Sequence, residues 1–204
     1  MKLPLFPLDT VLFPDGVLPL RIFETRYMDM VRACMKSQSE FGVVLIKSGK
    51  EVGSEVSIES VGTSAKIIEF DMNTPGILNI STRGIQRFNV QSTERAKDGL
   101  LIGEITWLAT QQPAPLAEQY AACSVLLANI IEQIEGTQEP TPAAGSRFST
   151  PRKLFDTAWV ADRLIEVLPV HRLAKQKLLE LSDPQSRMEV VFAFLQQKGV
   201  MHDI

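Results

Sequence analysis

The sequence LPLFPLDTVLFPDGVLPLRIFETRY, residues 3–27, decides the fold. Its apolar runs are short and are separated by prolines, which strands accept only at their ends, bulges or edges. The prolines and aspartates also exclude a continuous apolar helix here, and with it a secretory signal. We therefore predict three short strands, at residues 3–6, 11–13 and 17–23.

The spacing of the apolar residues changes at the end of this stretch, from a strand pattern to a helical one. Tyr27, Met30, Val31 and Cys34 fall at positions i, i+3, i+4 and i+7, which predicts an amphipathic helix of about three turns. Apolar runs bounded by turn residues at 73–76 and 97–99 predict further strands. These strands are expected at residues 41–47, 61–70, 77–81, 86–93 and 100–108. Such spacing is typical of a small closed or nearly closed barrel.

Helical patterns replace the strand patterns after residue 111. An apolar stripe with alternating spacings of four and three ends at Gly136, a natural C-terminal cap. The stripe favours a helix packed within a bundle, because a coiled coil needs three or four heptads. A homodimer through such a coiled coil stays open as the alternative. The members of the stripe are Leu116, Tyr120, Cys123, Leu127, Ile130 and Ile134.

Residues 136–149 are rich in Pro, Gly, Ser and Thr and are expected to form a flexible loop. Thr150 and Pro151 then resemble an N-cap followed by proline at the first helical position, which predicts a helix that Pro169 ends. Further helices are predicted at residues 172–181 and from Asp183 to residue 198. The chain is thus expected to be an α+β protein, with a β-rich subdomain at residues 1–110 and a helical bundle at 111–204.

Composition limits the classes of partner. The chain has 204 residues, with 21 Lys and Arg against 24 Asp and Glu, for a net charge of -3. Without clustered basic residues, nucleic acids and anionic membranes are disfavoured as partners. No apolar run approaches the ~18 residues of a membrane span. Cys34 and Cys123 lie far apart, which fits reduced thiols in a cytoplasmic protein.

The sequence contains no motif for catalysis. Gly49-Lys50-Glu51 lacks the glycine and the hydroxyl of a phosphate-binding loop, and no dinucleotide, zinc-protease or serine-hydrolase motif occurs. His171 stands where a helix begins, so we expect a turn or capping role, with a dyad with Cys34 or Cys123 as the alternative. We therefore expect no enzyme activity, no cofactor and no metal ion.

Two sets of polar residues allow more than one interpretation. Glu55, Ser57 and Glu59 share one strand face, which is typical of a solvated surface. The alternative is a cation site formed by Glu51, Glu55 and Glu59. Asn79 opens a glycosylation sequon, but it falls within an expected strand.

Charged residues also stand among apolar ones at the junction of strand and helix. Arg21 or Arg26 could pair with Glu24 to fix this junction, and Arg87 could cover a barrel end with its aliphatic stem. Contact with a ligand is the alternative for these arginines.

Several motifs together resemble the N-terminal substrate-binding domain of Lon proteases. The resemblance spans nearly the whole chain, although no motif matches over residues 109–150. It is carried by residues 4–8 (PLFPL), 11–14 (VLFP), 18–27 (LPLRIFETRY), 41–45 (FGVVL), 61–65 (VGTSA), 84–90 (GIQRFNV), 175–180 (KQKLLE) and 183–187 (DPQSR).

The resemblance implies a pseudobarrel like that of pseudouridine synthase and archaeosine transglycosylase (PUA-like), followed by a helical bundle. It also implies binding of polypeptides. In Lon proteases an ATPase module and a Ser-Lys protease domain follow this region, so this chain is expected to be a stand-alone relative that binds protein segments without unfolding or cleaving them. The partners expected are unfolded or specific protein segments, with a Lon-type protease as a further candidate.

Two physical routes lead to such binding. An edge strand could add a peptide strand, or exposed apolar residues beside the barrel could hold an unfolded segment. The alternatives are a PUA-like module that binds RNA or a nucleotide, and an enzyme with a small-molecule pocket in the barrel. The residues that we predict for the polypeptide-binding surface are Phe13, Pro14, Phe23 and Phe88, with Arg21 and Arg87 as polar partners.

Overall fold

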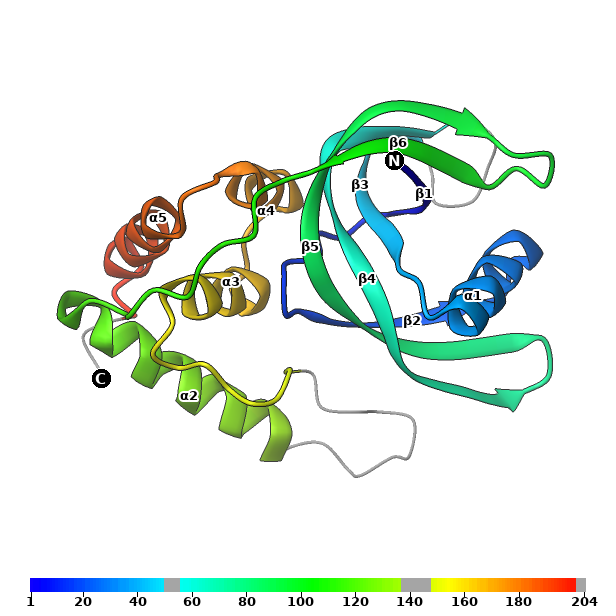
Figure 1. Cartoon of the computed structure of the whole chain (residues 1–204). Coiled ribbons are helices and arrows are strands. Elements are labelled where there is room, and N and C mark those ends of the chain that lie inside the picture. Colours follow the sequence, from blue (N-terminus) through cyan, green and yellow to red (C-terminus); the bar gives the residue numbers. More distant parts are fainter. Residues whose placement is uncertain (50–55, 137–147, 201–204) are drawn as a thin grey trace. The chain divides into compact units, whose positions relative to one another are not determined.

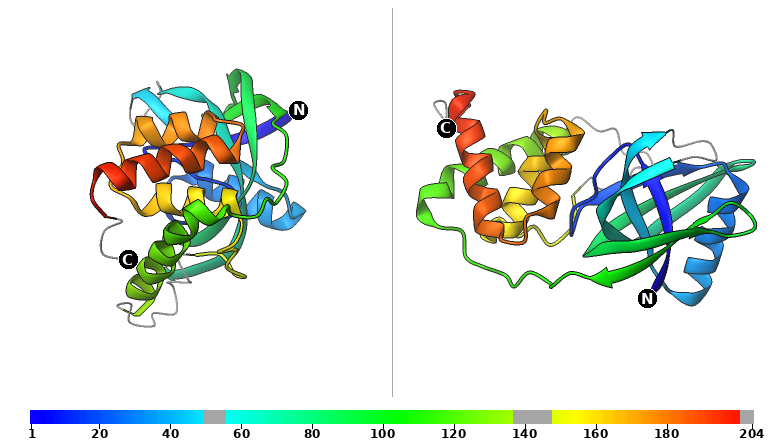
Figure 2. Two further views of the ribbon diagram at one scale, coloured as in Figure 1. Left: turned by 90° about the vertical axis from the view of Figure 1, so that its left-hand side faces the viewer. Right: turned by 90° about the horizontal axis from the view of Figure 1, so that it is seen from above.

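The computed structural model describes residues 1–49, 56–136 and 148–200. These residues divide into two compact units, Met1–Thr110 and the part from Gln111 onward. The strands lie in the first unit with one helix, and the second unit is helical (Figures 1 and 2). The predicted α+β class is confirmed. No helix in the described ranges is long and apolar enough to cross a membrane.

Within its described residues, the first unit holds a six-stranded sheet in the order β2-β5-β4-β3-β1-β6. Because β5 also pairs with β6, the strands β1, β3, β4, β5 and β6 close on themselves, and β2 lies alongside β5 (Figure 1). The β1–β3 pair is parallel. That this barrel is of the PUA type stays a prediction. The strands are β1 (Lys2–Leu8), β2 (Val17–Ile22), β3 (Phe41–Gly49), β4 (Val56–Thr74), β5 (Ile77–Arg95) and β6 (Leu101–Trp107).

Strands β4 and β5 are each 19 residues long, which allows each to serve several partners. Strand β5 therefore combines two strands that were predicted separately, at 77–81 and 86–93. The prediction was wrong because Gly84 does not interrupt the strand. A Cβ at Gly84 would stand 2.2 Å from the carbonyl oxygen of Phe13, so this position needs glycine for the close approach of another backbone segment.

The strand predicted at residues 11–13 is absent. These residues are buried, but individual hydrogen bonds hold them, and they form no strand ladder. The Thr63 hydroxyl donates to the Leu12 carbonyl at 2.6 Å, and the Asp15 amide donates to the Gly84 carbonyl at 2.8 Å. Asp15 has φ 62°, so the chain turns here before it can extend into a strand.

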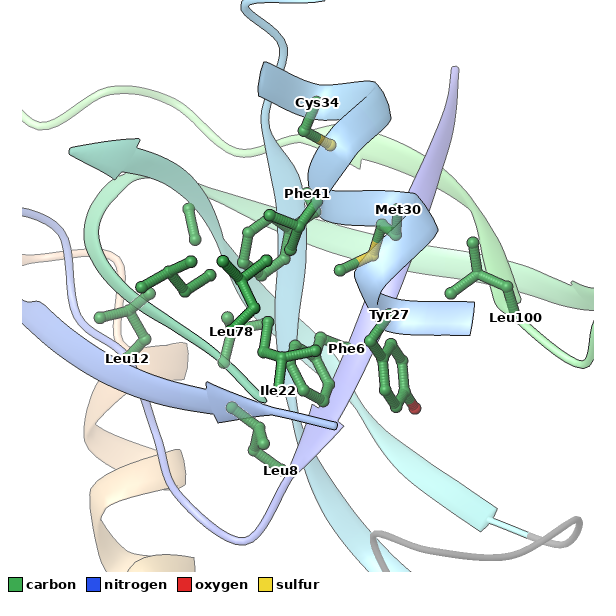
Figure 3. Close-up of a cluster of buried hydrophobic side chains, with 14 residues drawn as sticks. Phe6, Leu8, Leu12, Ile22, Tyr27, Met30, Cys34, Phe41, Leu78 and Leu100 are labelled. Carbon is green, nitrogen blue, oxygen red and sulfur yellow. The ribbon is translucent and has the colours of Figure 1, made fainter. Parts of the chain in front are cut away.

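Helix α1 (Thr25–Ser37) buries the face that its periodicity predicted, formed by Tyr27, Met30, Val31 and Cys34. This face lies in a core cluster with side chains from the sheet (Figure 3). The rings of Phe6 and Tyr27 stack there with centroids 4.0 Å apart.

A second cluster fills another part of the barrel around Phe88, which is fully buried. Glycine opposite Phe88 makes room for it. A Cβ at Gly42 would stand 2.6 Å from Cζ of Phe88, and a Cβ at Gly62 would stand 2.8 Å from the same atom. The alternative of an enzyme with a small-molecule pocket in the barrel loses support here, because apolar side chains occupy this space. The remaining members of this second cluster are Leu3, Leu5, Val44, Leu101 and Ile105.

Both predicted turns are confirmed. Thr74 pairs with Ile77 across Pro75-Gly76, and Gly76 takes φ 79°, which suits glycine at the second turn position. In the second turn the Leu100 amide donates to the Asp98 carboxylate at 3.0 Å.

The second unit contains a 3₁₀ helix, η1, and four α-helices among its described residues. Helix α3 begins at Thr157, so the prediction of an N-cap at Thr150 was wrong. The Asp156 carboxylate instead accepts from the Trp159 amide at 2.8 Å, while Leu116 and Phe155 pair through a backbone hydrogen bond of 2.8 Å. The bounds are η1 (Glu118–Tyr120), α2 (Ala121–Gly136), α3 (Thr157–Val167), α4 (Arg172–Glu180) and α5 (Pro184–Gln197).

Helix α2 buries Cys123 and Leu127 as predicted, but Ile131 is buried in place of Ile130. A straight helix explains this difference, since its 3.6-residue period drifts away from a strict seven-residue seam. The flexible loop predicted at 136–149 lies for the most part outside the described residues, as do Glu51 and Glu55.

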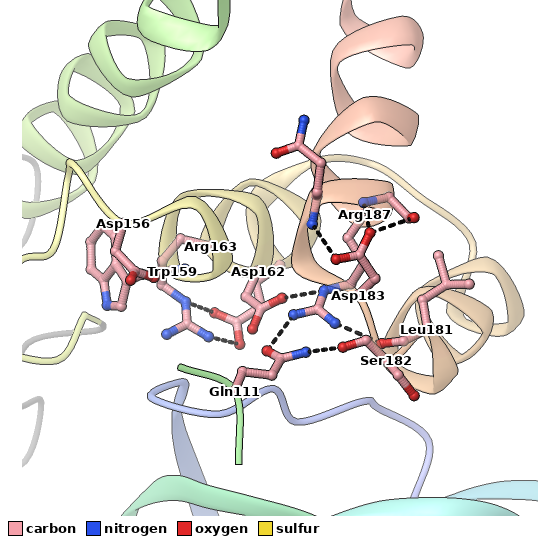
Figure 4. A network of polar contacts seen from close by, with 12 residues as sticks. Gln111, Asp156, Trp159, Asp162, Arg163, Leu181, Ser182, Asp183 and Arg187 are labelled. Carbon is pink, nitrogen blue, oxygen red and sulfur yellow. Dashed lines mark hydrogen bonds and ion pairs between the residues drawn. The ribbon is translucent and has the colours of Figure 1, made fainter. Parts of the chain in front are cut away.

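A buried ion pair joins α3 to α5 (Figure 4). Nε of Arg187 donates to Oδ1 of Asp162 at 2.9 Å, and both side chains are nearly inaccessible to solvent. The guanidinium also donates to the Leu181 carbonyl at 2.7 Å and to Oε1 of Gln111 at 2.6 Å. Gln111 in turn donates to the Ser182 carbonyl at 2.9 Å. The donors of Arg187 thus link the middle of α3, the end of α4 and the segment at Gln111, which lie far apart in the sequence.

Candidate functional site

The candidate site lies on a three-stranded part of the first unit that extends past the barrel. Strand β3 pairs with β4 as far as Ala65, opposite Phe41. Beyond that pair, β4 is bonded to β5 alone among the described strands, and β5 is bonded to β2 on its other side. We call this part the arm; it consists of residues 17–22, 66–74 and 77–83. The β4 strand therefore has an open edge from Lys66 onward.

The register aligns side chains across the arm. Leu20, Ile80 and Phe70 form one row, because Ile80 is paired with both of the others. In the next row Asn79 is paired with Arg21 and with Asp71. Paired residues project to the same face of a sheet, so the row that contains Arg21 is polar and projects away from the core.

Large apolar side chains are exposed along the open edge. Ile68, Phe70 and Met72 are 48%, 62% and 51% exposed, and they alternate with Glu69 and Asp71. Single exposed apolar residues are common on proteins, but a row of them marks a binding surface or an aggregation hazard. An edge strand that carries such a row is able to pair with another chain.

The surface is hollow on both sides of this row. A groove of about 620 Å³ is lined by residues 19–21 of β2, residues 68–71 of β4 and residues 79–81 of β5. A second cavity, of about 290 Å³, lies between the end of α1 and the open edge. Its lining residues are Cys34, Met35, Gln38, Ser39, Lys66, Ile67, Ile68 and Phe70.

The end of α1 explains why the edge is open. Gln38 follows the helix with φ 53°, a left-handed conformation, and its amide bonds to the Cys34 carbonyl. The chain turns there and joins β4 only at Phe41. Among the described residues, β5 pairs with β4 at residues 66–70 on one side, and no backbone segment pairs with these residues on the other side.

The six residues predicted for binding do not gather at one place. Phe13 and Phe88 are fully buried, Arg87 is 4% exposed and Pro14 is half-buried. Phe88 packs edge-on against Trp107, with centroids 6.2 Å apart. A binding role for any of the six stays a prediction.

Arg21 and Phe23 are exposed, and Arg21 lines the groove of the arm. The side chain of Arg21 makes no hydrogen bond or ion pair with a described residue. By contrast, Arg26 pairs with Glu24 at 2.7 Å and donates to the Gly99 carbonyl at 3.1 Å. Arg26 therefore has the structural role at the strand-helix junction that was one of its two interpretations.

Sequence reasoning missed Ile68, Phe70 and Met72. Their alternation with acidic residues is typical of a half-buried strand, which would assign all three to a core. The one available signal of their exposure is their position next to the turn at 73–76. Residues near the tip of a long hairpin extend past the neighbouring elements that would otherwise cover them.

The groups considered for catalysis are placed in structural roles. Nδ1 of His171 accepts from the Leu173 amide at 3.3 Å and caps α4, which confirms the predicted capping role. Burial raises the pKa of the Cys34 thiol, and it raises the pKa of Cys123 to about 11. Thiols with raised pKa values are poor nucleophiles at neutral pH. Across the described ranges no three His, Cys, Asp or Glu side chains gather as ligands for a metal ion.

A family model described as the ATP-dependent protease La (LON) substrate-binding domain matches residues 2–197. The Lon protease of Xanthomonas oryzae pv. oryzae is 25% identical over 193 residues, which are 94% of this chain and 22% of that protein. The Lon protease of Escherichia coli strain K12 is 23% identical over 201 residues, or 97% of this chain and 25% of that protein. The chain thus spans about a quarter of the length of these curated relatives.

Solved structures show the same similarity. The crystal structure of a Lon N-terminal domain protein from Xanthomonas campestris matches with a TM-score of 0.72 and 34% identity, covering 95% of this chain and 98% of that one. The N-terminal domain of a Mycobacterium avium complex Lon protease matches with a TM-score of 0.65 over 96% of this chain and 98% of that one. At 18% identity, this second match shows the fold alone.

Proposed function

The chain belongs to the family of the ATP-dependent protease La (LON) substrate-binding domain, and from that premise we propose that it binds polypeptide segments with exposed apolar side chains. The observation that carries this proposal is the row Ile68, Phe70 and Met72 on the open edge of β4. The apolar side chains of a target polypeptide are mostly buried when it is folded. The row would therefore select unfolded or locally extended segments, in which those side chains are exposed.

The geometry supports the proposal in two ways. Apolar contact supplies affinity without a demand for one particular sequence, at about 25 cal/mol for each Å² removed from water. The groove of about 620 Å³ beside the row gives the bound side chains a concave surface. This volume is within the usual range for ligand sites, roughly 300–1,000 Å³.

The proposal includes no chemical step. The raised thiol pKa values and the capping role of His171 leave these groups with structural roles. We propose that the bound segments are unfolded or specific protein segments, and that the chain holds them without cleaving them. A Lon-type protease as a partner, a homodimer and a cytoplasmic location stay predictions.

The test is a binding titration of the full chain with a fluorescently labelled, chemically unfolded protein. The double substitution Ile68→Ser and Phe70→Ser should raise Kd about tenfold, because it removes two exposed apolar contacts of ~1 kcal/mol each or less. Both side chains are exposed, so the folded state should be retained, which circular dichroism and thermal unfolding check.

The matched control is the double substitution Val125→Ser and Val190→Ser. These valines are each 49% exposed and lie on helices of the second unit, away from the arm in sequence. Binding should be unchanged in the control. Equal losses in both variants would mean that apolar surface in general, rather than the arm, holds the polypeptide.

A further inference from the structure

We propose that the open edge of β4 takes up an extended peptide as an added antiparallel strand, and that it selects segments in which apolar residues alternate with Lys or Arg. This inference rests on the proposed function and names its substrate class. It is drawn from the open backbone edge, the two cavities beside it, and the different character of the two faces of β4.

The backbone supplies the first part. Lys66, Ile67, Glu69, Phe70 and Asp71 each have a partner on β5, and β3 has ended at Ala65. An added strand would occupy the position that β3 would reach if it began earlier, and would continue the antiparallel order. Antiparallel pairing is the more stable arrangement per residue.

The side chains supply the second part. Glu69 is paired with Ser81 and Asp71 with Asn79, so both carboxylates project to the polar face of the arm. Phe70 is paired with Ile80 and projects to the opposite face, beside the cavity at the end of α1. An added strand alternates its own side chains between the same two faces.

Charge complementarity then selects the residue types. Residues opposite Phe70 should be apolar, because they would lie on the same face as Phe70 and the cavity that Phe70 lines. Residues opposite Glu69 and Asp71 should be Lys or Arg, since opposite charges directly across a sheet attract and like charges repel. Glu69 and Asp71 are the acidic residues of this edge, and Lys66 stands at its other end next to Ala65.

The same charges disfavour two of the registers in which a second copy of this chain could be the occupant. Two β4 edges that pair antiparallel about a two-fold axis must centre on one residue. A centre at Glu69 opposes Glu69 to itself, and a centre at Phe70 opposes Glu69 to Asp71. Both registers bring like charges together across the new pair.

The experiment uses the full chain and synthetic peptides of about eight residues, long enough to cover the edge at ~3.4 Å per residue. One peptide alternates Leu or Phe with Lys, and a second has Glu in place of each Lys. A third has the composition of the first but places its apolar residues at helical spacing. The alternating Lys peptide should bind at least about tenfold tighter than the others, with an affinity that falls as salt rises.

Backbone methylation tests the mode of binding. Every second amide of the alternating Lys peptide is N-methylated, once in the odd and once in the even register. In an added strand, amides of one register face β4 and those of the other face solvent. One methylated peptide should therefore lose binding while the other keeps it. Equal binding of the two would overturn strand addition.

The variant Glu69→Lys should reverse the preference, so that the Glu peptide binds better than the Lys peptide. Glu132→Lys is the control, because Glu132 is exposed on α2 and the change in net charge is the same. A reversal in both variants would show an effect of net charge alone and would overturn the inference.

Failure of the inference and failure of the proposed function can be told apart. If the unfolded protein still binds through Ile68 and Phe70 but Lys and Glu peptides bind alike, the proposed function stands and the alternation rule is wrong. If neither peptide nor unfolded protein binds, both are wrong. Dimerisation that Glu69→Lys changes, measured by sedimentation, would assign the edge to a second copy and overturn the inference.

Discussion

At the scale of single residues, Arg187 shows how much one side chain can organise. Its guanidinium bonds to Asp162, to the Leu181 carbonyl and to Gln111, and it is almost fully buried. Arginine is suited to this position because its planar fork presents several donors in fixed directions. The sequence DPQSR, residues 183–187, predicted a helix cap at its start and carried part of the family resemblance, but nothing in the spacing of Asp162 and Arg187 predicts that they meet.

Removal of one partner of this pair should strongly destabilise the second unit. Asp162→Ala leaves the buried guanidinium without its counter-charge, which costs about 3–5 kcal/mol in comparable buried pairs. The measurement is denaturant unfolding followed by the fluorescence of Trp159, which lies on α3, in a Trp107→Phe background.

The double substitution Asp162→Leu with Arg187→Met provides the contrast. Because it removes both charges and retains volume, it should cost less than Asp162→Ala alone. A double variant that is as unstable as the single one would show that the remaining hydrogen bonds of Arg187, rather than its charge pair, stabilise the unit.

At the scale of elements, local capping chemistry decides where helices begin. Asp183 caps α5 ahead of Pro184, as the sequence predicts, and its carboxylate accepts from the Ser186 amide at 2.8 Å and the Ser186 hydroxyl at 2.7 Å. Helix α3 was placed wrongly, because Thr150-Pro151 and Asp156 are both acceptable starts. The pairing of Leu116 with Phe155, distant in the sequence, keeps the chain extended until Asp156.

The cap of α5 should depend on pH. Hydrogen bonds from Ser186 hold the pKa of Asp183 below its ordinary value of 3.8. A lowered folded-state pKa means that the carboxylate stabilises the fold above pH 3.8 and that this contribution is lost as the pH falls through the lower value. The difference in unfolding free energy between the natural chain and Asp183→Ala should therefore be constant near neutral pH and disappear in acid.

Urea unfolding at a series of pH values measures this difference. Glu132→Ala is the control, because Glu132 is an exposed carboxylate within α2 that caps no helix. A difference for Asp183→Ala that persists in strong acid would show that the aspartate acts through its shape rather than its charge.

At the scale of the whole molecule, closure of the barrel depends on residues without side chains. Gly42 and Gly62 lie on neighbouring strands, and both leave space that Phe88 occupies. The motifs FGVVL, VGTSA and GIQRFNV include these three residues. Their roles become clear only when β3, β4 and β5 are side by side.

Gly62→Ala should therefore destabilise the first unit. Its Cβ would stand 2.5 Å from the Val43 carbonyl oxygen and 2.6 Å from Cγ1 of Val44, both closer than real contacts. Overpacking of this kind costs about 1–3 kcal/mol. Trp107 packs against Phe88, so its fluorescence in a Trp159→Phe background reports the change.

Gly136→Ala is the matched control, since among the described residues no atom outside its own helix and chain neighbours lies within 4 Å of the position its Cβ would take. It should leave the Trp107 transition unchanged. If Gly62→Ala also leaves the transition unchanged, the barrel is less tightly packed around Phe88 than the structure indicates.

The sequence by itself determined the elements whose signals are local. Periodicity placed the buried face of α1, prolines and glycines placed the turns, and Asp183 and His171 placed the starts of α5 and α4. Its motifs also carried the family resemblance. Only the tertiary structure decided what depends on contacts between distant segments: the single long strand β5, the pair of Asp162 with Arg187, and the exposure of Ile68, Phe70 and Met72. The physical reason is that an alternating strand shows which residues share a face, whereas the neighbouring strands decide whether that face is covered.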